Sequence, residues 1–249
     1  PLYLTASFIL EEGLPLDTLK AIAQSMADTA AEADIQIVAG DTKVVEKGKA
    51  DQLFISTAGI GWIPEGVNLG GENARDGDLV ILSGSIGEHG MAVLSARGNF
   101  NFSSEIQSDV APLNHLIQGI LSYAPQVHVL RDPTRGGLAT TLNEIAIQSQ
   151  VTIELNEEAI PIQPPVRAAC EMLGFDPLYV ANEGKVIIVL PEAEAGSVIP
   201  YLHSQPLGRE AKVIGRIKKD LTSRVLLKTI IGGTRIVDML AGEMLPRIC

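Results

Sequence analysis

Strand-like and helix-like segments alternate along most of this sequence. Residues 2–10 are rich in β-branched and aromatic residues, whereas residues 15–33 place apolar side chains at helical spacing on one face. Further strands are expected at residues 35–40, 51–60, 79–84, 127–130, 151–155, 185–190, 211–217 and 223–229. Further helices are expected at residues 87–97, 109–122, 135–148, 164–173 and 192–204, the last one interrupted near Pro200. Mixed strands and helices throughout predict an α/β or α+β fold.

One stretch breaks this alternation. Residues 61–78 are rich in Gly, Asn, Asp and Pro, which form turns and linkers. We interpret the stretch as the boundary between two domains, which agrees with a length of 249 residues at roughly 150 residues per domain. The sequence also begins at Pro1 inside a strand-like run, so we expect that processing or truncation has removed residues before it.

The composition is that of a globular protein and argues against several functions. Hydrophobic residues make up 46% and charged residues 20%, which is enough apolar material for a core. The net charge of −11 argues against a nucleic-acid-binding protein, because such proteins usually carry a basic face. No apolar run reaches the roughly 20 residues of a membrane-spanning helix, and no basic-then-apolar leader indicates secretion.

The two cysteines are too few for a disulfide framework, which favours a reducing, cytoplasmic environment. Cys170 lies in an apolar, helix-like run and is expected to be buried. Cys249 is the last residue. Pro246 disfavours a helix there, so an extended tail of residues 242–249 would carry the terminal thiol about 25 Å. Because an exposed free thiol is usually avoided, we interpret Cys249 as functional.

The first candidate ligands for phosphate or metal follow the strand expected at residues 35–40. Gly40 would end that strand, and Asp41, Thr42 and Lys43 would form a turn directly after it. The Asp41 carboxylate can bind a metal ion, and the Lys43 ammonium can pair with a phosphate. Taken alone, these residues also fit an ordinary polar turn.

Two further turns carry candidates for chemistry. Residues 83–90 form a Gly-rich connection from strand to helix, which can present backbone N–H groups to an anion, and they include His89. The connection lacks the Gly-Lys-Ser/Thr of a P-loop and the glycine spacing of a dinucleotide fingerprint. At residues 181–185, Glu183 lies at the entrance of a strand, where it could act as a general base. Both turns also fit ordinary structural turns.

The connection at residues 131–137 joins a strand to a strongly amphipathic helix. Asp132 or Thr134 can cap that helix, whose N-terminus favours an anion. Two arginines and one aspartate together favour binding of a phosphate and a metal ion. A helix cap with solvated arginines explains the same residues.

Taken together, these motifs resemble the HypE family of hydrogenase maturation proteins. The matching stretches are residues 8–20, 38–48, 130–140, 181–185 and 246–249, and the similarity covers essentially the whole chain. The terminal Pro-Arg-Ile-Cys is the most specific of them. The others are typical of the wider, ATP-using superfamily that resembles aminoimidazole-ribonucleotide synthetase.

The resemblance implies a two-domain PurM-like fold. Residues 1–66 would be the remainder of an incomplete N-terminal domain for ATP binding and dimerisation. Residues 67–240 would form a C-terminal domain with a mixed sheet flanked by helices. Residues 241–249 would be a mobile tail that ends in the reactive cysteine.

The resemblance also implies an enzyme, an ATP-dependent carbamoyl dehydratase. In this family the carbamoyltransferase HypF places a carbamoyl group on the C-terminal thiol, and ATP is used to dehydrate the thiocarbamate to a thiocyanate. The cyanide then passes to iron held by the HypC–HypD complex, for the [NiFe]-hydrogenase. Phosphorylation turns the amide oxygen into a good leaving group, while a base removes the protons of the amide nitrogen.

Individual roles follow from the resemblance, residue by residue. Four residues are expected to take part in the chemistry: Cys249 as carrier of the substrate, Glu183 as the base, Lys43 as an aid to deprotonation, and His89 near the reacting phosphoryl group. Six are expected to bind the nucleotide: Asp41, Thr42, Asp132, Thr134, Arg135 and Gly136. Asp132 and Asp41 are also the expected ligands of Mg²⁺.

Members of the family carry an N-terminal portion with acidic metal-binding residues, which this sequence lacks. We therefore expect weak ATP binding, weak activity and an altered homodimer. Two other functions stay open. A related phosphotransferase, such as selenophosphate synthetase or thiamine-monophosphate kinase, would use the same scaffold without a terminal thiol. A non-enzymatic docking module for the maturation complex would need only the tail.

Overall fold

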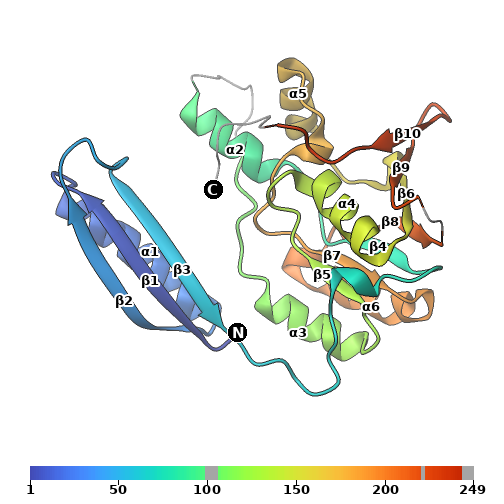
Figure 1. The fold of residues 1–249 in the computed structure, drawn as a ribbon, viewed down its shortest axis with the longest axis horizontal. Coiled ribbons are helices and arrows are strands. Elements are labelled where there is room, and N and C mark those ends of the chain that lie inside the picture. The colour runs from blue at the N-terminus through green and yellow to red at the C-terminus, as the bar shows by residue number, and fades with distance from the viewer. Residues whose placement is uncertain (99–105, 220–221, 243–249) are drawn as a thin grey trace. The chain divides into compact units, whose positions relative to one another are not determined.

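The computed structural model describes residues 1–98, 106–219 and 222–242 (Figure 1). Its internal contacts divide the chain into two units, Pro1–Val67 and Asn68–Cys249, and each has its own sheet. Among the described residues, no helix is long and apolar enough to cross a membrane.

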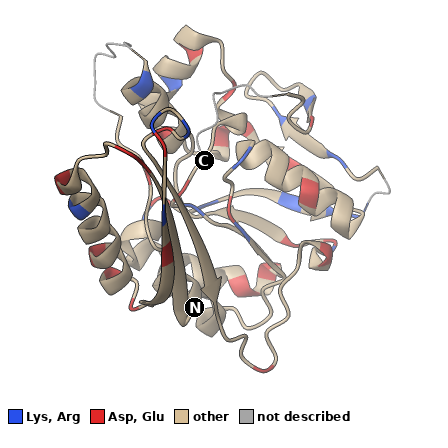
Figure 2. Cartoon of the chain, turned by 60° about the vertical axis from the view of Figure 1, so that its left-hand side comes forward, with Lys and Arg blue, Asp and Glu red and all other residues tan. Residues whose placement is uncertain are grey.

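The first unit is a three-stranded sheet with one helix. Its elements are β1 (Tyr3–Glu11), α1 (Leu16–Glu32), β2 (Gln36–Val45) and β3 (Leu53–Ile60), and the sheet order is β2-β1-β3. β1 runs parallel to β2, so the chain crosses over through α1, and it runs antiparallel to β3. The least exposed residues of α1 are Leu19, Ile22, Met26 and Ala30, which confirms the apolar stripe expected there. Most of the charged residues of α1 are acidic (Figure 2).

β2 extends beyond the strand that the sequence predicts, because it ends at Val45 rather than at Gly40. Asp41, Thr42 and Lys43 are therefore strand residues paired with β1, and the expected turn is wrong. Gly40 is opposite Ala6, and a Cβ atom at Gly40 would overlap the Ala6 carbonyl oxygen. Glycine here permits two strands to approach closely, whereas the Gly-Asp pair in the sequence is typical of a turn.

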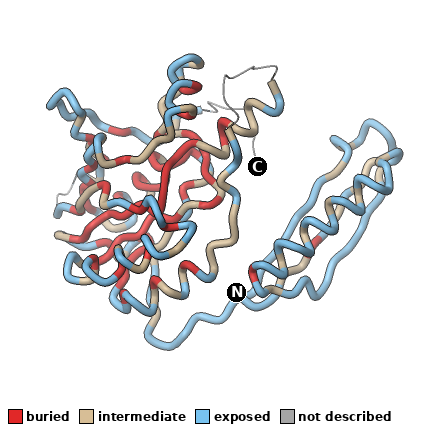
Figure 3. Tube along the Cα trace, turned by 180° about the vertical axis from the view of Figure 1, so that it is seen from behind, coloured by how far each residue is buried: buried red, intermediate tan, exposed pale blue. Residues whose placement is uncertain are grey.

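The sheet of the first unit has an exposed face (Figure 3), and this face carries several apolar side chains. Tyr3 pairs with Ile60, and Ile9 pairs with Phe54. The exposed fractions of these four residues are 44%, 64%, 43% and 53% in that order. Thr5 and the Ser7–Ser56 pair lie between these two apolar pairs, so the exposed face is apolar near both ends and polar between them.

The second unit contains a mixed sheet of seven strands in the order β10-β9-β6-β8-β4-β7-β5. Its strands are β4 (Leu79–Leu82), β5 (Val129–Arg131), β6 (Thr152–Asn156), β7 (Ile187–Leu190), β8 (Lys212–Lys218), β9 (Val225–Lys228) and β10 (Thr234–Val237). Its α-helices are α2 (Glu88–Arg97), α3 (Asn114–Tyr123), α4 (Gly137–Ser149), α5 (Pro164–Leu173) and α6 (Glu192–Ser204).

Helices cover both faces of this sheet, as expected. The four residues of β4 are all buried, and successive side chains point to opposite faces. Val80 and Leu82 pack in the cluster that contains α4, while Leu79 and Ile81 pack in the cluster that contains α3 and α6. The buried strands form the centre of the unit in Figure 3.

A third cluster joins α2 to α5 and contains Cys170. This side chain is buried, which confirms the expectation from its apolar surroundings. Burial raises the pKa of the Cys170 thiol to about 11, so it stays protonated and unreactive at neutral pH.

Several elements of the second unit begin or end within two residues of the expected bounds, and three differ from the expectation by more than that. α3 begins at Asn114 instead of residue 109, because Pro112 disfavours a helical residue before it. α6 continues through Pro200 without the expected interruption. The short strand β10 follows a tight turn in which Thr229 N donates to Gly233 O, and its four residues carry too little pattern to predict a strand.

The close contact at Gly40 makes a direct prediction. Gly40→Ala forces β2 away from β1 and should lower the stability of the first unit by about 1–3 kcal/mol. Hydrogen exchange should become faster at the amides of β1 and β2. The matched control is Gly196→Ala, at an exposed helical glycine with open space around it, which should raise stability by about 0.5–1 kcal/mol. Unchanged exchange in β1 and β2 would contradict the packing role of Gly40.

Candidate functional site

Three strand ends of the second unit meet at one residue, Ile187. In the ladder, Leu82 at the end of β4 and Arg131 at the end of β5 both pair with Ile187 at the start of β7. The segments that adjoin these ends are residues 83–87, 132–136 and 180–186. Topology therefore brings together three turns that lie far apart in the sequence.

The buried side chain of Asn182 ties these three turns to one another. Its Oδ1 accepts from Gly87 N at 2.7 Å, and its Nδ2 donates to Pro133 O and to Val180 O, both at 3.0 Å. Only 1% of the residue is exposed, so these bonds satisfy a polar group that water does not reach. Because Glu183 follows directly, its position is set by this network.

Glu183 lies at the entrance of β7, where the sequence predicts it, and three charged residues face it. Burial is the largest effect on its carboxyl and raises the pKa above the ordinary value of 4.5. The positive charge of protonated His89 lowers the pKa, whereas the negative charges of Asp109 and Asp132 raise it. A carboxyl with a raised pKa is a stronger base once it is ionised, which suits proton abstraction.

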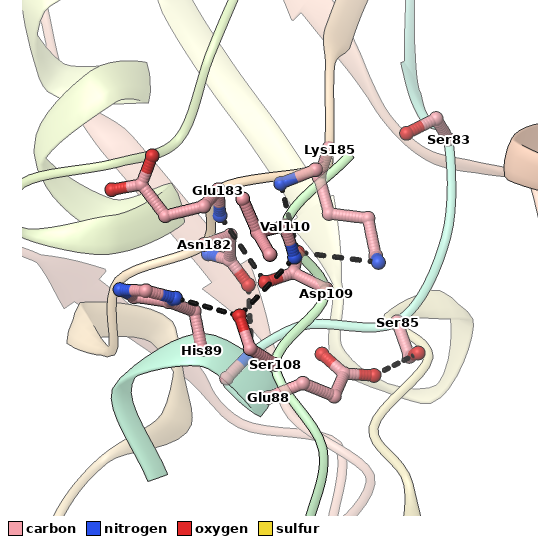
Figure 4. Close-up of polar contacts among 12 residues, drawn as sticks. Ser83, Ser85, Glu88, His89, Ser108, Asp109, Val110, Asn182, Glu183 and Lys185 are labelled. Atoms are coloured by element: carbon pink, nitrogen blue, oxygen red, sulfur yellow. Dashed lines mark hydrogen bonds and ion pairs between the residues drawn. The ribbon is translucent and has the colours of Figure 1, made fainter. Parts of the chain in front are cut away.

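The segment before α3 binds to two of these groups (Figure 4). Ser108 Oγ lies 2.8 Å from Nδ1 of His89 and also accepts from Val110 N. Asp109 accepts from the backbone N–H groups of Glu183 and Gly184, both at 3.2 Å, and forms an ion pair with Lys185 at 3.2 Å. The structure thus brings His89 and Glu183 together with Asp109, which the sequence analysis did not identify.

The turn after β5 presents an exposed carboxylate beside a helix N-terminus. Thr134 Oγ1 donates to Asp132 Oδ2 at 3.0 Å, and Arg135 is exposed. Gly136 has φ of 73° and Gly137 has φ of 60°, a conformation that favours glycine. A Cβ at Gly137 would lie 2.6 Å from the carbonyl oxygens of Leu178 and Val180, so close packing also requires glycine there.

The other expected residues lie in the first unit or outside the described residues. Asp41 and Thr42 line a hollow of about 560 Å³ beside Ala6 and Phe8, and Lys43 follows in the same exposed strand. Cys249 lies outside the described residues. Among those that are described, no group of three or more His, Cys, Asp or Glu side chains is arranged to hold a metal ion.

Both units match known domains. Residues 1–63 match the AIR synthase related protein, N-terminal domain, and residues 75–228 match the AIR synthase related protein, C-terminal domain. The carbamoyl dehydratase HypE of Cupriavidus necator is 55% identical over 249 residues, which is 100% of this chain and 71% of that protein. The chain belongs to the HypE family of carbamoyl dehydratases.

Solved structures of HypE agree with this assignment. A crystal structure of the hydrogenase maturation protein HypE in complex with ATP has a TM-score of 0.96 at 47% identity, and the match covers 100% of this chain and 76% of that one. A crystal structure of a HypE–HypF complex has a TM-score of 0.93 at 49% identity, and the match covers 96% of this chain and 78% of that one. The two-domain PurM-like fold expected for the HypE family is therefore confirmed.

Sequence reasoning identified Glu183, His89 and Asp132 but gave no role to Asn182, Asp109 or Lys185. Asn182 and Lys185 lie in the same short motif as Glu183, so the motif itself was the available signal. Asp109 carried no signal, because its backbone partners lie 74 and 75 residues away and the segment was expected to be helical.

The Asn182 network predicts the effect of a single isosteric change. Asn182→Asp replaces the donating NH₂ group by an oxygen that faces the carbonyls of Pro133 and Val180. We expect a loss of about 3 kcal/mol, measured by urea unfolding followed by circular dichroism. Asn156→Asp is the matched control: Asn156 Oδ1 accepts from Glu158 N at an exposed cap, where Asp serves equally well. Equal unfolding midpoints for the two variants would contradict the network's importance.

Proposed function

We propose that this chain dehydrates the carbamoylated thiol of its own Cys249 to a thiocyanate, in a reaction that consumes ATP. The observation that carries the proposal is the half-buried Glu183 carboxyl, whose pKa is raised first by burial and then by the negative charges of Asp109 and Asp132. Membership of the HypE family supports the same activity. Loss of water from R–S–CO–NH₂ leaves R–S–C≡N.

Glu183 is the proposed base. Both N–H bonds of the carbamoyl group must break as its C–O bond breaks, so a carboxylate has to accept protons beside the reacting carbon. The raised pKa of Glu183 makes that transfer more favourable than for an ordinary carboxylate. His89 on α2 lies within electrostatic reach of Glu183, and we propose that it stabilises negative charge near the reacting phosphoryl group.

ATP supplies the phosphoryl group that makes the carbamoyl oxygen a leaving group. Thr134, Arg135 and Gly136 would bind its phosphates at the N-terminus of α4, which favours anions, and Asp132 would bind the nucleotide through Mg²⁺. The exposed Asp132 fits Mg²⁺, because this ion usually takes one or two carboxylates together with phosphate oxygens and water. A HypE crystallised with ATP supports nucleotide binding.

Three residues of the first unit, Lys43, Asp41 and Thr42, also have proposed roles. Lys43 is proposed to aid deprotonation, Asp41 to bind Mg²⁺ and Thr42 to bind the nucleotide. The exposed apolar side chains of Tyr3, Ile9, Phe54 and Ile60 support a homodimer, since a second copy would cover them.

We propose HypF as the donor of the carbamoyl group and the HypC–HypD complex as the acceptor of cyanide, for the iron of a [NiFe]-hydrogenase. A crystal structure of a HypE–HypF complex supports the first partner. We propose that this chain and these partners act in the cytoplasm, which agrees with the scarcity of cysteine.

The test is the intact mass of the full chain after incubation with HypF, carbamoyl phosphate and ATP. We expect a carbamoyl adduct on Cys249 that then loses the mass of one water only when ATP is present. Cys249→Ala should acquire no adduct. Glu183→Gln should acquire the carbamoyl adduct but should not lose the mass of water, because an amide side chain is not a base.

Two results would contradict the proposal. If active HypF leaves no adduct on Cys249, the cysteine does not carry the substrate. If Glu183→Gln loses water at the parental rate, Glu183 is not the base. Adding one residue after Cys249 is a further control: it should abolish the reaction here, whereas a related phosphotransferase would be indifferent to it.

A further inference from the structure

One buried carboxylate, Asp109, holds three consecutive residues around the candidate base. Its Oδ1 accepts from Glu183 N, and its Oδ2 accepts from Gly184 N and pairs with Nζ of Lys185, all at 3.2 Å (Figure 4). Asp109 comes from the segment before α3, so it reaches these residues from a separate part of the chain.

At this contact the backbone around Asp109 lies so close to the turn that residue 184 has to be glycine. A Cβ at Gly184 would overlap the carbonyl oxygen of Asp109 and would lie 3.2 Å from Ala111 N. Gly184 therefore lets the segment before α3 sit directly against the turn. The result is a short, fixed connection between Asp109 and the backbone of Glu183.

The pair of Asp109 and Lys185 is almost fully withdrawn from water. The exposed fractions of the two side chains are 3% and 14%. A buried ion pair is usually no more stable than well-packed apolar residues, because both charges lose their hydration. A gain in stability therefore does not explain this pair well. A requirement for one fixed geometry explains it better.

The same segment also contacts His89, another charged neighbour of Glu183. Ser108 Oγ lies 2.8 Å from His89 Nδ1, and Asp109 faces Glu183. The charged groups around the Glu183 carboxyl are thus His89 from α2, Asp109 from the segment before α3, and Asp132 after β5. Figure 4 shows Lys185 and Glu183 projecting to opposite sides of their shared segment.

We propose that Asp109 is the positioning residue of Glu183: with Lys185 as its counter-ion, it fixes the Glu183–Gly184 backbone so that the Glu183 carboxylate is presented to the substrate. This rests on the proposed function, in which Glu183 is the base. Asp109 itself touches neither substrate nor nucleotide in this role.

Asp109→Asn tests the proposal. The new NH₂ group would face Gly184 N and Lys185 Nζ, which are themselves donors, so the turn loses its clamp. We expect the rate of water loss from carbamoylated Cys249, at saturating ATP, to fall on the order of 100-fold. The ATP concentration for half-maximal rate should not change, because Asp109 does not bind the nucleotide.

Two readouts separate positioning from a general structural role. The acid limb of the pH–rate profile should move to lower pH in Asp109→Asn, because a negative charge that raises the pKa of Glu183 is gone. Hydrogen exchange should become faster at the amides of Glu183 and Gly184 while the central strands β4 and β7 keep their protection.

Asp176→Asn is the matched control. Asp176 also accepts from a backbone N–H, that of Leu178, and pairs with Arg235 at 2.6 Å, but it faces none of the site residues. This variant should keep the parental rate and pH profile. Asp109→Ser, which is smaller and also uncharged, is measured in parallel and should behave like Asp109→Asn.

The outcomes distinguish this inference from the proposed function. Suppose that the parental chain loses water, Glu183→Gln does not, and folded Asp109→Asn keeps the parental rate and amide exchange. The positioning role of Asp109 is then wrong, while the role of Glu183 as the base stands. If the parental chain never loses water, the proposed function fails, and exchange at Glu183 and Gly184 still decides whether Asp109 clamps the turn. Loss of the fold in both Asp109 variants would assign Asp109 to stability and overturn the positioning role.

Discussion

The hydrogen bonds of Asn182 are the constraint on which the candidate site depends. The sheet brings the ends of β4, β5 and β7 together at Ile187, and the turns beyond those ends are held by hydrogen bonds outside the strands. One buried amide with both donors and its acceptor satisfied joins all three turns. His89 follows Gly87 by two residues, Glu183 follows Asn182 directly, and Asp132 directly precedes Pro133. Their proximity is thus a consequence of topology, of this side chain, and of backbone hydrogen bonds such as those from Gly90 N to Ala181 O and from Ser83 N to Val186 O.

The electrostatics of Glu183 result from opposing effects on the same carboxyl. Burial and the charges of Asp109 and Asp132 favour the protonated form, whereas His89 favours the ionised form. A base must be ionised at neutral pH yet bind a proton readily, and this balance serves both needs. The surrounding geometry is fixed from two directions, by Asn182 on one side and by Asp109 with Lys185 on the other.

The fold was largely predictable because its signals are local. The α1 stripe and most strands follow from periodicity, and the resemblance to HypE supplied the domain architecture. The strand end predicted at Gly40 was wrong, because the sequence does not distinguish a glycine that permits close strand pairing from one that ends a strand. At the site, Glu183 and Asp132 were found from motifs. Asp109 was not found, because the backbone groups that it binds lie 74 and 75 residues away, and no local sequence pattern indicates such contacts.

The most direct test of this account is the pKa of Glu183 itself. It can be measured by ¹³C NMR titration of side-chain carboxyl carbons, with the Glu183 signal assigned by its absence in Glu183→Gln. The account predicts that Glu183 titrates above its ordinary value of 4.5 in the folded chain. Titration at or below that value would mean that the site does not hold its carboxyl in the state required of a base, and would contradict the central claim.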